Sequence, residues 1–159
     1  MLEPKIVPPE ATGLNKDEVT IAEVLSQAGY NTAHIGKWHQ WDIEQAYPHN
    51  QGFDEFYGIP NTTDETLYIP TSTENVTSLP DGFNEPSIIR SKAGGELENV
   101  KPYNFDTRRT IDVELADMSV DFIKQHGKSD NPFFLFVAWT RPHYPNFTSR
   151  EFEGASRVG

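Results

Sequence analysis

A helix followed directly by a buried strand is the pattern that most constrains the fold, and it occurs twice in the chain. In the first copy, a helix over about residues 19–30 has one apolar face and ends at Gly29, a residue type favoured just after helices. Asn15 or Asp17 is the expected N-cap. A short buried strand is predicted at 31–35. The residues of the helical face are Ile21, Val24, Leu25 and Ala28.

The second copy starts with an apolar helical face and stops near His126 and Gly127. Pro132 then opens the continuous apolar run 133–139, which is typical of a strand covered on both sides. Such strands usually belong to parallel sheets flanked by helices, so the sequence predicts an α/β fold with a mostly parallel sheet. The helical face consists of Ile111, Leu115, Met118 and Phe122.

The segment between the two copies, about 41–106, has no sustained apolar period and contains many prolines. We expect irregular structure packed on the sheet, with short strands near 66–69 and 87–89. Loops of this kind often shape a substrate pocket.

Each predicted strand is followed by a loop with a basic residue and a histidine: Lys37 and His39 after the first, Arg141 and His143 after the second. Ligands of open parallel sheets bind beyond the carboxyl ends of the strands, so the two loops are expected to converge on one site. An ammonium group suits a sulfate or phosphate oxygen, and histidine can act as an acid or base near neutral pH. Arg141 has a second interpretation, as the partner of a nearby carboxylate.

The other three histidines are interpreted as structural. His34 lies inside the first predicted strand and is expected in the core, His49 sits in a turn, and His126 closes a helix.

Composition excludes several functions. The 159 residues suffice for one domain, and the lack of cysteine excludes disulfides, thiolate metal sites and cysteine nucleophiles. A net charge of −11 argues against nucleic acid or an anionic membrane as the main partner. It also means that an anionic substrate depends on locally placed cations. No apolar run approaches the roughly 20 residues of a membrane span.

The run TIAEVLSQAGYNTAHIGKWH, followed by NQGFDEFYG, strongly resembles the second signature region of the sulfatases, which are alkaline-phosphatase-like α/β hydrolases. The stretch NPFFLFVAWTRPHYPNFTSREFEG resembles a strand of that family and its exit loop. The resemblance covers roughly residues 14–58 and 110–154. In sulfatases the lysine and histidine of the Gly-Lys-x-His segment lie in the active site, as does a histidine after a Pro-His step. These correspond here to Lys37, His39 and His143.

What the resemblance implies is a sulfuric ester hydrolase in which a formylglycine nucleophile attacks sulfur. His143 is then the acid for the leaving alcohol, His39 assists the formylglycine, and Lys37 neutralises sulfate oxygens. The resemblance further implies Ca²⁺ as cofactor and a periplasmic or secreted location. A small sulfate ester or a sulfated glycan is the implied substrate.

Some family features are missing from the chain. The formylglycine arises from the Cys or Ser of a Cys/Ser-x-Pro-x-Arg segment, and the segment that begins at Ser78 fails at the arginine position. The paired aspartates that bind calcium and a later Asp-Asn pair are also absent. We therefore expect residues 1–159 to be part of a single sulfatase catalytic domain, truncated at both ends and inactive alone. A phosphodiesterase or phosphonate hydrolase of the same superfamily and a non-catalytic binding module remain as alternatives.

Overall fold

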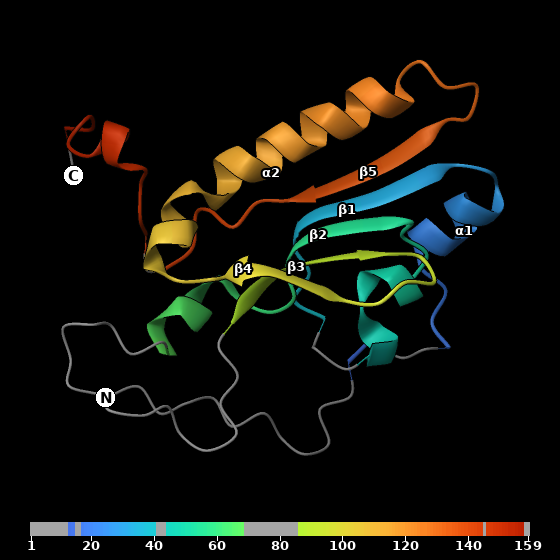
Figure 1. The fold of residues 1–159 in the computed structure, drawn as a ribbon, viewed down its shortest axis with the longest axis horizontal. Coiled ribbons are helices and arrows are strands. Elements are labelled where there is room, and N and C mark those ends of the chain that lie inside the picture. The colour runs from blue at the N-terminus through green and yellow to red at the C-terminus, as the bar shows by residue number, and fades with distance from the viewer. Residues whose placement is uncertain (1–12, 15–16, 41–43, 69–85, 145, 158–159) are drawn as a thin grey trace.

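The computed structural model describes residues 13–14, 17–40, 44–68, 86–144 and 146–157, which form one sheet flanked by helices (Figure 1). The helices of this part are α1 (Ile21–Gln27) and α2 (Phe105–His126). The strands are β1 (Asn31–Lys37), β2 (Glu55–Ile59), β3 (Ser87–Lys92), β4 (Glu98–Pro102) and β5 (Phe133–Ala138). Short 3₁₀ helices are η1 (Glu44–Ala46), η2 (Pro48–Asn50), η3 (Thr63–Tyr68) and η4 (Arg150–Phe152). Neither of the described α-helices is long and apolar enough to cross a membrane.

The sheet has five strands in the order β4-β3-β2-β1-β5. β1 pairs in parallel with β2 on one side and with β5 on the other, whereas β2–β3 and β3–β4 are antiparallel. The α/β fold class predicted from the two helix-strand units is confirmed. Those units supply β1 and β5 at one side of the sheet, and α2 runs along the same side in Figure 1.

Helix α1 begins two residues later than predicted. Its N-cap is Thr20, whose hydroxyl accepts a hydrogen bond from the Glu23 amide at 3.1 Å, while the Glu23 carboxylate accepts one from the Thr20 amide at 2.7 Å. The expected cap at Asp17 is wrong, because this reciprocal Thr-x-x-Glu pair satisfies the first amides of the helix. Asn15 lies outside the described residues. Gly29 follows the helix with a φ of 87°, as predicted.

The middle segment contains more regular structure than its sequence indicates. β2, β3 and β4 all lie in it, and only the strand near 87–89 was predicted. The strand expected at 66–69 is wrong where it is described, because Thr63–Tyr68 forms the 3₁₀ helix η3; residue 69 lies outside the described part. β4 is largely exposed, so its sequence lacks the apolar alternation that marks a half-buried strand.

The core lies between α2 and the sheet. The predicted face of α2 is confirmed: Ile111, Leu115 and Phe122 are buried, and they cluster with Ala33 and Ile35 of β1. Because side chains alternate across a strand, the next residues of β1 and β2 point to the opposite face. That face holds an aromatic cluster made of His34, Trp38, Phe53, Phe56 and Phe136.

β5 differs from its prediction in one respect. Its apolar run favoured a strand covered on both faces, but some of its side chains are exposed. Among the described residues β5 is also an edge strand, which pairs only with β1. Phe136 is 48% exposed, and Trp139 just after the strand is 49% exposed. The described part of the chain therefore lacks the neighbours that would cover this strand.

Candidate functional site

Three loops leave the sheet at one edge, because β1, β2 and β5 run parallel as neighbours. At their carboxyl ends, Gly36 of β1 pairs with Gly58 of β2 and with Ala138 of β5. Lys37 is the last residue of β1, and the loop that carries His143 begins directly after Ala138. The two loops singled out from the sequence therefore start side by side, with the β2 exit loop next to them.

Small residues at this edge let the three strands approach closely. Gly36 has a φ of 122°, and a Cβ atom placed on it would lie 1.9 Å from the carbonyl oxygen of Ala138. A Cβ atom on Gly58 would lie 1.8 Å from the carbonyl oxygen of Gly36. A side chain is thus excluded at both glycines of this row, and this explains the glycine before Lys37.

The chain after Lys37 continues alongside the exit of β2. The Trp38 amide donates to the Ile59 carbonyl at 3.0 Å, and the His39 amide donates to the Pro60 carbonyl at 2.9 Å. His39 is exposed and has a φ of 58°, so its imidazole no longer follows the alternation of the strand. Trp38 is structural: its indole N–H donates to the Ala46 carbonyl at 2.7 Å.

The second loop holds His143 by both its backbone and its ring. The His143 carbonyl accepts a hydrogen bond from Nη2 of Arg108 at 3.0 Å. Nδ1 of the His143 ring lies 2.7 Å from the Tyr144 carbonyl oxygen. A carbonyl oxygen can only accept, so Nδ1 carries the proton and the lone pair of the neutral ring is on Nε2.

Arg141 is held away from a substrate-binding role. Its Nε donates to Oδ2 of Asp112 at 2.8 Å, and its Nη2 donates to the Arg109 carbonyl at 3.2 Å. The other oxygen of Asp112 accepts from both the amide and the hydroxyl of Thr140, at 2.9 and 3.0 Å. The interpretation of Arg141 as a carboxylate partner is confirmed, which leaves Lys37 as the candidate cation of the two loops.

Hydrogen bonds join the exit loops of β2 and β5. The Thr63 hydroxyl donates to the Thr140 carbonyl at 3.3 Å, and the hydroxyl of buried Tyr103 donates to the Thr63 carbonyl at 3.2 Å. Together with the bond from His39 to Pro60, these contacts connect all three loops into one unit.

Asp64, in η3, adds a negative charge close to His143. Its burial raises the pKa of the carboxyl group. Hydrogen bonds from Thr62 and from the backbone of Asp64, together with the charges of His143 and Arg108, outweigh that effect and hold the pKa below its usual value. One of its oxygens, Oδ1, is buried without a hydrogen-bond partner among the described residues.

Sequence reasoning missed Asp64, Arg108 and Asp112. Arg108 and Asp112 are spaced i, i+4 and fall on the same face of α2 as Ile111 and Leu115. Charged residues on the core face of a helix are the signal that could have identified these two as parts of a buried network. Asp64 carried no comparable signal.

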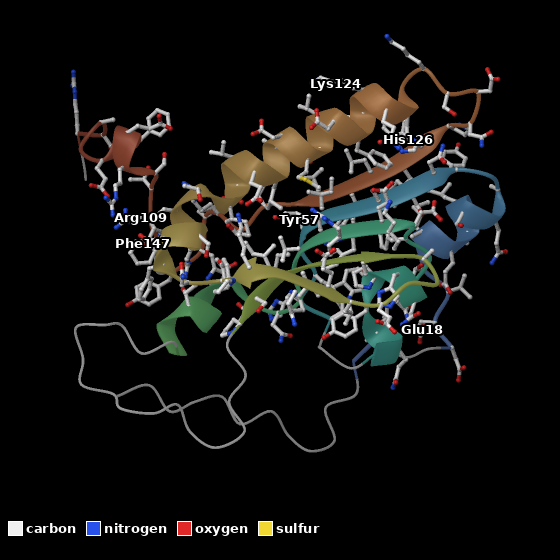
Figure 2. All side chains as sticks on the ribbon, in the orientation of Figure 1. Glu18, Tyr57, Arg109, Lys124, His126 and Phe147 are labelled. Carbon is white, nitrogen blue, oxygen red and sulfur yellow. The ribbon has the colours of Figure 1, made fainter. Side chains whose placement is uncertain are left out.

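The remaining histidines lie outside this unit. His34 is fully buried, and its Nε2 donates to the Lys37 carbonyl at 3.2 Å; burial lowers its pKa to about 4. It is the core histidine that was predicted. His126 packs on Phe122 at the far end of α2 from Arg109, as Figure 2 shows. His49, in η2, stacks on Tyr47 just before that helix.

The residues that the structure describes do not form a calcium site by themselves. Among the described residues, no group of three or more His, Cys, Asp or Glu side chains could hold a metal ion. Cysteine is absent from the whole sequence.

Comparison with known proteins gives the family. A family model described as Sulfatase matches residues 3–159. The chain belongs to the sulfatase family. Human arylsulfatase A is 31% identical over 163 aligned residues, which cover 97% of this chain and 30% of that protein. Mouse N-acetylgalactosamine-6-sulfatase is 29% identical over 151 residues, with 92% of this chain and 26% of that protein covered.

Solved sulfatase structures share the fold. The PsFucS1 sulfatase from Pseudoalteromonas sp. superposes with a TM-score of 0.77 at 34% identity, over 89% of this chain and 30% of its own. The structure of Ps i-CgsB in complex with k-i-k-neocarrahexaose gives a TM-score of 0.59 at 25% identity, over 86% of this chain and 29% of its own. This sulfatase-family chain thus spans under a third of the length of these relatives.

Proposed function

We propose that this chain is part of the catalytic domain of an enzyme that hydrolyses sulfate esters, and that Lys37, His39 and His143 bind and process the sulfate group. The observation that carries the proposal is the parallel pairing of Gly36 with Ala138, from which the loops with these residues leave at one edge. Membership of the sulfatase family supports the same chemistry.

Each residue has a role that its surroundings allow. Lys37 supplies a positive charge to sulfate oxygens in a chain whose net charge is −11. Nδ1–H of His143 donates to the Tyr144 carbonyl, so Nε2 is the atom that exchanges a proton with the leaving oxygen. A protonated ring can still donate from Nδ1 to the same carbonyl, which supports the acid form. His39 assists the nucleophile from the neighbouring loop.

The nucleophile and the calcium ligands belong, in this proposal, to polypeptide outside residues 1–159. The sequence has no cysteine and no Cys/Ser-x-Pro-x-Arg segment from which a formylglycine could form. The described residues also offer no cluster for a metal ion. On this view, residues 1–159 contribute one side of the site, and the chain is a part of one domain that is truncated at both ends.

A sulfated glycan, or a small sulfate ester, is the substrate class we propose. Support comes from two relatives: one is named an N-acetylgalactosamine-6-sulfatase, and another was solved in complex with k-i-k-neocarrahexaose. The exit loop of β2, between Pro60 and Tyr68, borders the proposed site and is well placed to contact the alcohol part of the substrate.

The test begins with the DNA on both sides of the coding segment. An in-frame Cys/Ser-x-Pro-x-Arg segment upstream is the expected result. The complete reading frame is then expressed with the formylglycine-generating enzyme and assayed on para-nitrophenyl sulfate. We expect Lys37→Ala and His143→Ala to lower kcat/KM by about 10²-fold or more, as for lost charge stabilisation or proton transfer.

Matched controls are His126→Ala, at the C-terminal end of α2, and Lys128→Ala, in the turn just after it; they remove the same groups far from the proposed site and should leave kcat/KM within about twofold. Equal activity of the Lys37 and His143 variants and these controls would overturn the site assignment. A natural stop codon and promoter at the ends of the segment would favour the non-catalytic module instead.

A further inference from the structure

We infer that Arg108 is the positioning residue for His143: its buried guanidinium joins the His143 carbonyl to η3 and thereby fixes the loop in which the imidazole donates from Nδ1. This inference rests on the proposed role of His143. It assigns a function to a residue of α2 that lies outside the three loops at the sheet edge.

Arg108 lies between two of those loops. Its Nη2 donates to the His143 carbonyl and its Nη1 donates to the Thr66 hydroxyl, both at 3.0 Å. The side chain is only 2% exposed, and its guanidinium also lies 5.5 Å from the centre of the Phe147 ring. A planar group with fixed donors can hold two acceptors at a set distance and angle from each other. The geometry is therefore that of a brace between η3 and the β5 exit loop.

Stability alone does not explain an arginine at this position. Arg108 is in the first turns of α2, where the helix dipole disfavours a positive charge. Its burial lowers its pKa, which means that the environment penalises the charged form. Both hydrogen-bond acceptors are neutral, and a well-packed apolar residue is often at least as stabilising at such a site. An arginine at this position is therefore better explained by the geometry that its guanidinium imposes on the two loops.

A second interaction supports the assignment. The charges of Arg108 and His143 both act on Asp64, whose carboxylate lies in the same helix as Thr66. The positive guanidinium can therefore stay charged between the two loops. The neighbouring ion pair of Arg141 with Asp112 holds the start of the β5 exit loop, so Arg108 acts on the part that remains, around His143.

The experiment measures the ring nitrogens of His143 in the chain labelled with ¹⁵N-histidine. Long-range ¹H–¹⁵N spectra distinguish an Nδ1–H ring from an Nε2–H ring. We expect His143 to be in the Nδ1–H form in the unmodified chain. In Arg108→Gln, the ratio of the Nδ1–H to the Nε2–H form should fall about three- to tenfold, the effect of losing one hydrogen bond of ordinary strength.

Arg108→Lys should recover part of that ratio, because an ammonium can donate to the His143 carbonyl but cannot hold both acceptors in one plane. Arg150→Gln is the matched control, since Arg150 is exposed and its removal changes the net charge equally. If Arg108→Gln does not fold, Thr66→Val provides the test, because it removes the η3 end of the brace and should shift the same ratio less.

An unchanged His143 tautomer in a folded Arg108→Gln or Thr66→Val chain would overturn the inference, as would an Nε2–H ring in the unmodified chain. The NMR measurement needs no turnover. A negative result for Arg108 is therefore distinct from failure of the proposed function, which is tested by hydrolysis with the Lys37 and His143 variants.

Discussion

Acidification should destabilise the chain through His34, and the size of the effect follows from its surroundings. His34 is fully buried, with its ring 5.1–5.4 Å from the rings of Trp38, Phe53, Phe56 and Phe136. Nε2–H donates to the Lys37 carbonyl, so protonation would occur at Nδ1, which has no hydrogen-bond partner among the described residues. A charge there would be enclosed by aromatic rings, and burial lowers the pKa from 6.5 to about 4.

The sign follows from which state binds the proton first. As the pH falls below 6.5, the unfolded chain protonates His34 while the folded chain does not, so the free energy of unfolding falls until the pH reaches about 4. A difference of 2.5 pKa units corresponds to about 3.4 kcal/mol over that whole range. Between pH 7 and pH 5, before most carboxylates titrate, the loss is about 1.8 kcal/mol.

Urea unfolding of the chain and of His34→Leu at pH 7, 6 and 5 measures the contribution of His34 to the pH dependence of the unfolding free energy. Leucine keeps an apolar side chain in the cluster and removes the titrating ring, so the variant should lose about 1.8 kcal/mol less than the unmodified chain over this interval. His39→Asn is the control, because His39 is exposed and asparagine tolerates its positive φ. Identical pH dependence of the unmodified chain and His34→Leu would refute the reasoning.

Three further outcomes are expected. The purified 159-residue chain should release no product from an aryl sulfate, even with calcium added, because it lacks the nucleophile segment; turnover above a buffer blank would contradict the proposed division of the site. The chain should be prone to self-association at high concentration, since β5 is an edge strand with exposed apolar side chains, and a monomer at all concentrations in sedimentation velocity would count against this. Gly36→Ala should lower the stability by about 3 kcal/mol or more through its collision with the Ala138 carbonyl, measured by urea unfolding. The control is Gly95→Ala, because Gly95 has a negative φ and more space around it; this change should alter the stability by under about 1 kcal/mol. Equal losses in both variants would argue against the close approach of Gly36 to the Ala138 carbonyl.

The parts of the fold that the sequence predicted are those with strong local signals. The face of α2 and the strand at 133–139 follow from apolar spacing, and both are present. Thr20 was missed as an N-cap because Asn15 and Asp17 are equally good residue types; only the reciprocal bond with Glu23 decides between them. β2 and β4 were missed because their neighbours in the sheet, and not their own periodicity, stabilise them as strands.

The residues of the candidate site also separate into those with a local sequence signal and those without one. Lys37, His39 and His143 were predicted because each follows a predicted strand and because the segments around them resemble sulfatase sequences; their shared site stays a prediction. Arg108 acts through a contact with a residue 35 positions away, and no local pattern encodes such a pairing. Arg141 was an ambiguous candidate for the same reason, because its Asp112 partner is 29 positions away.

The absence of cysteine allows a direct test of whether the two histidines share one site. His39→Cys and His143→Cys, introduced together, provide the only two thiols for a short bismaleimide. In a shared site the two side chains lie within about 10 Å, the span of groups around one tetrahedral anion, so we expect an efficient cross-link within one chain. His126→Cys with His143→Cys is the control pair: 18 helical residues separate Arg108, which contacts His143, from His126, a distance of about 27 Å, so this pair should label without cross-linking. Full labelling of both cysteines at positions 39 and 143 with no internal cross-link would contradict the shared site and, with it, the proposed roles.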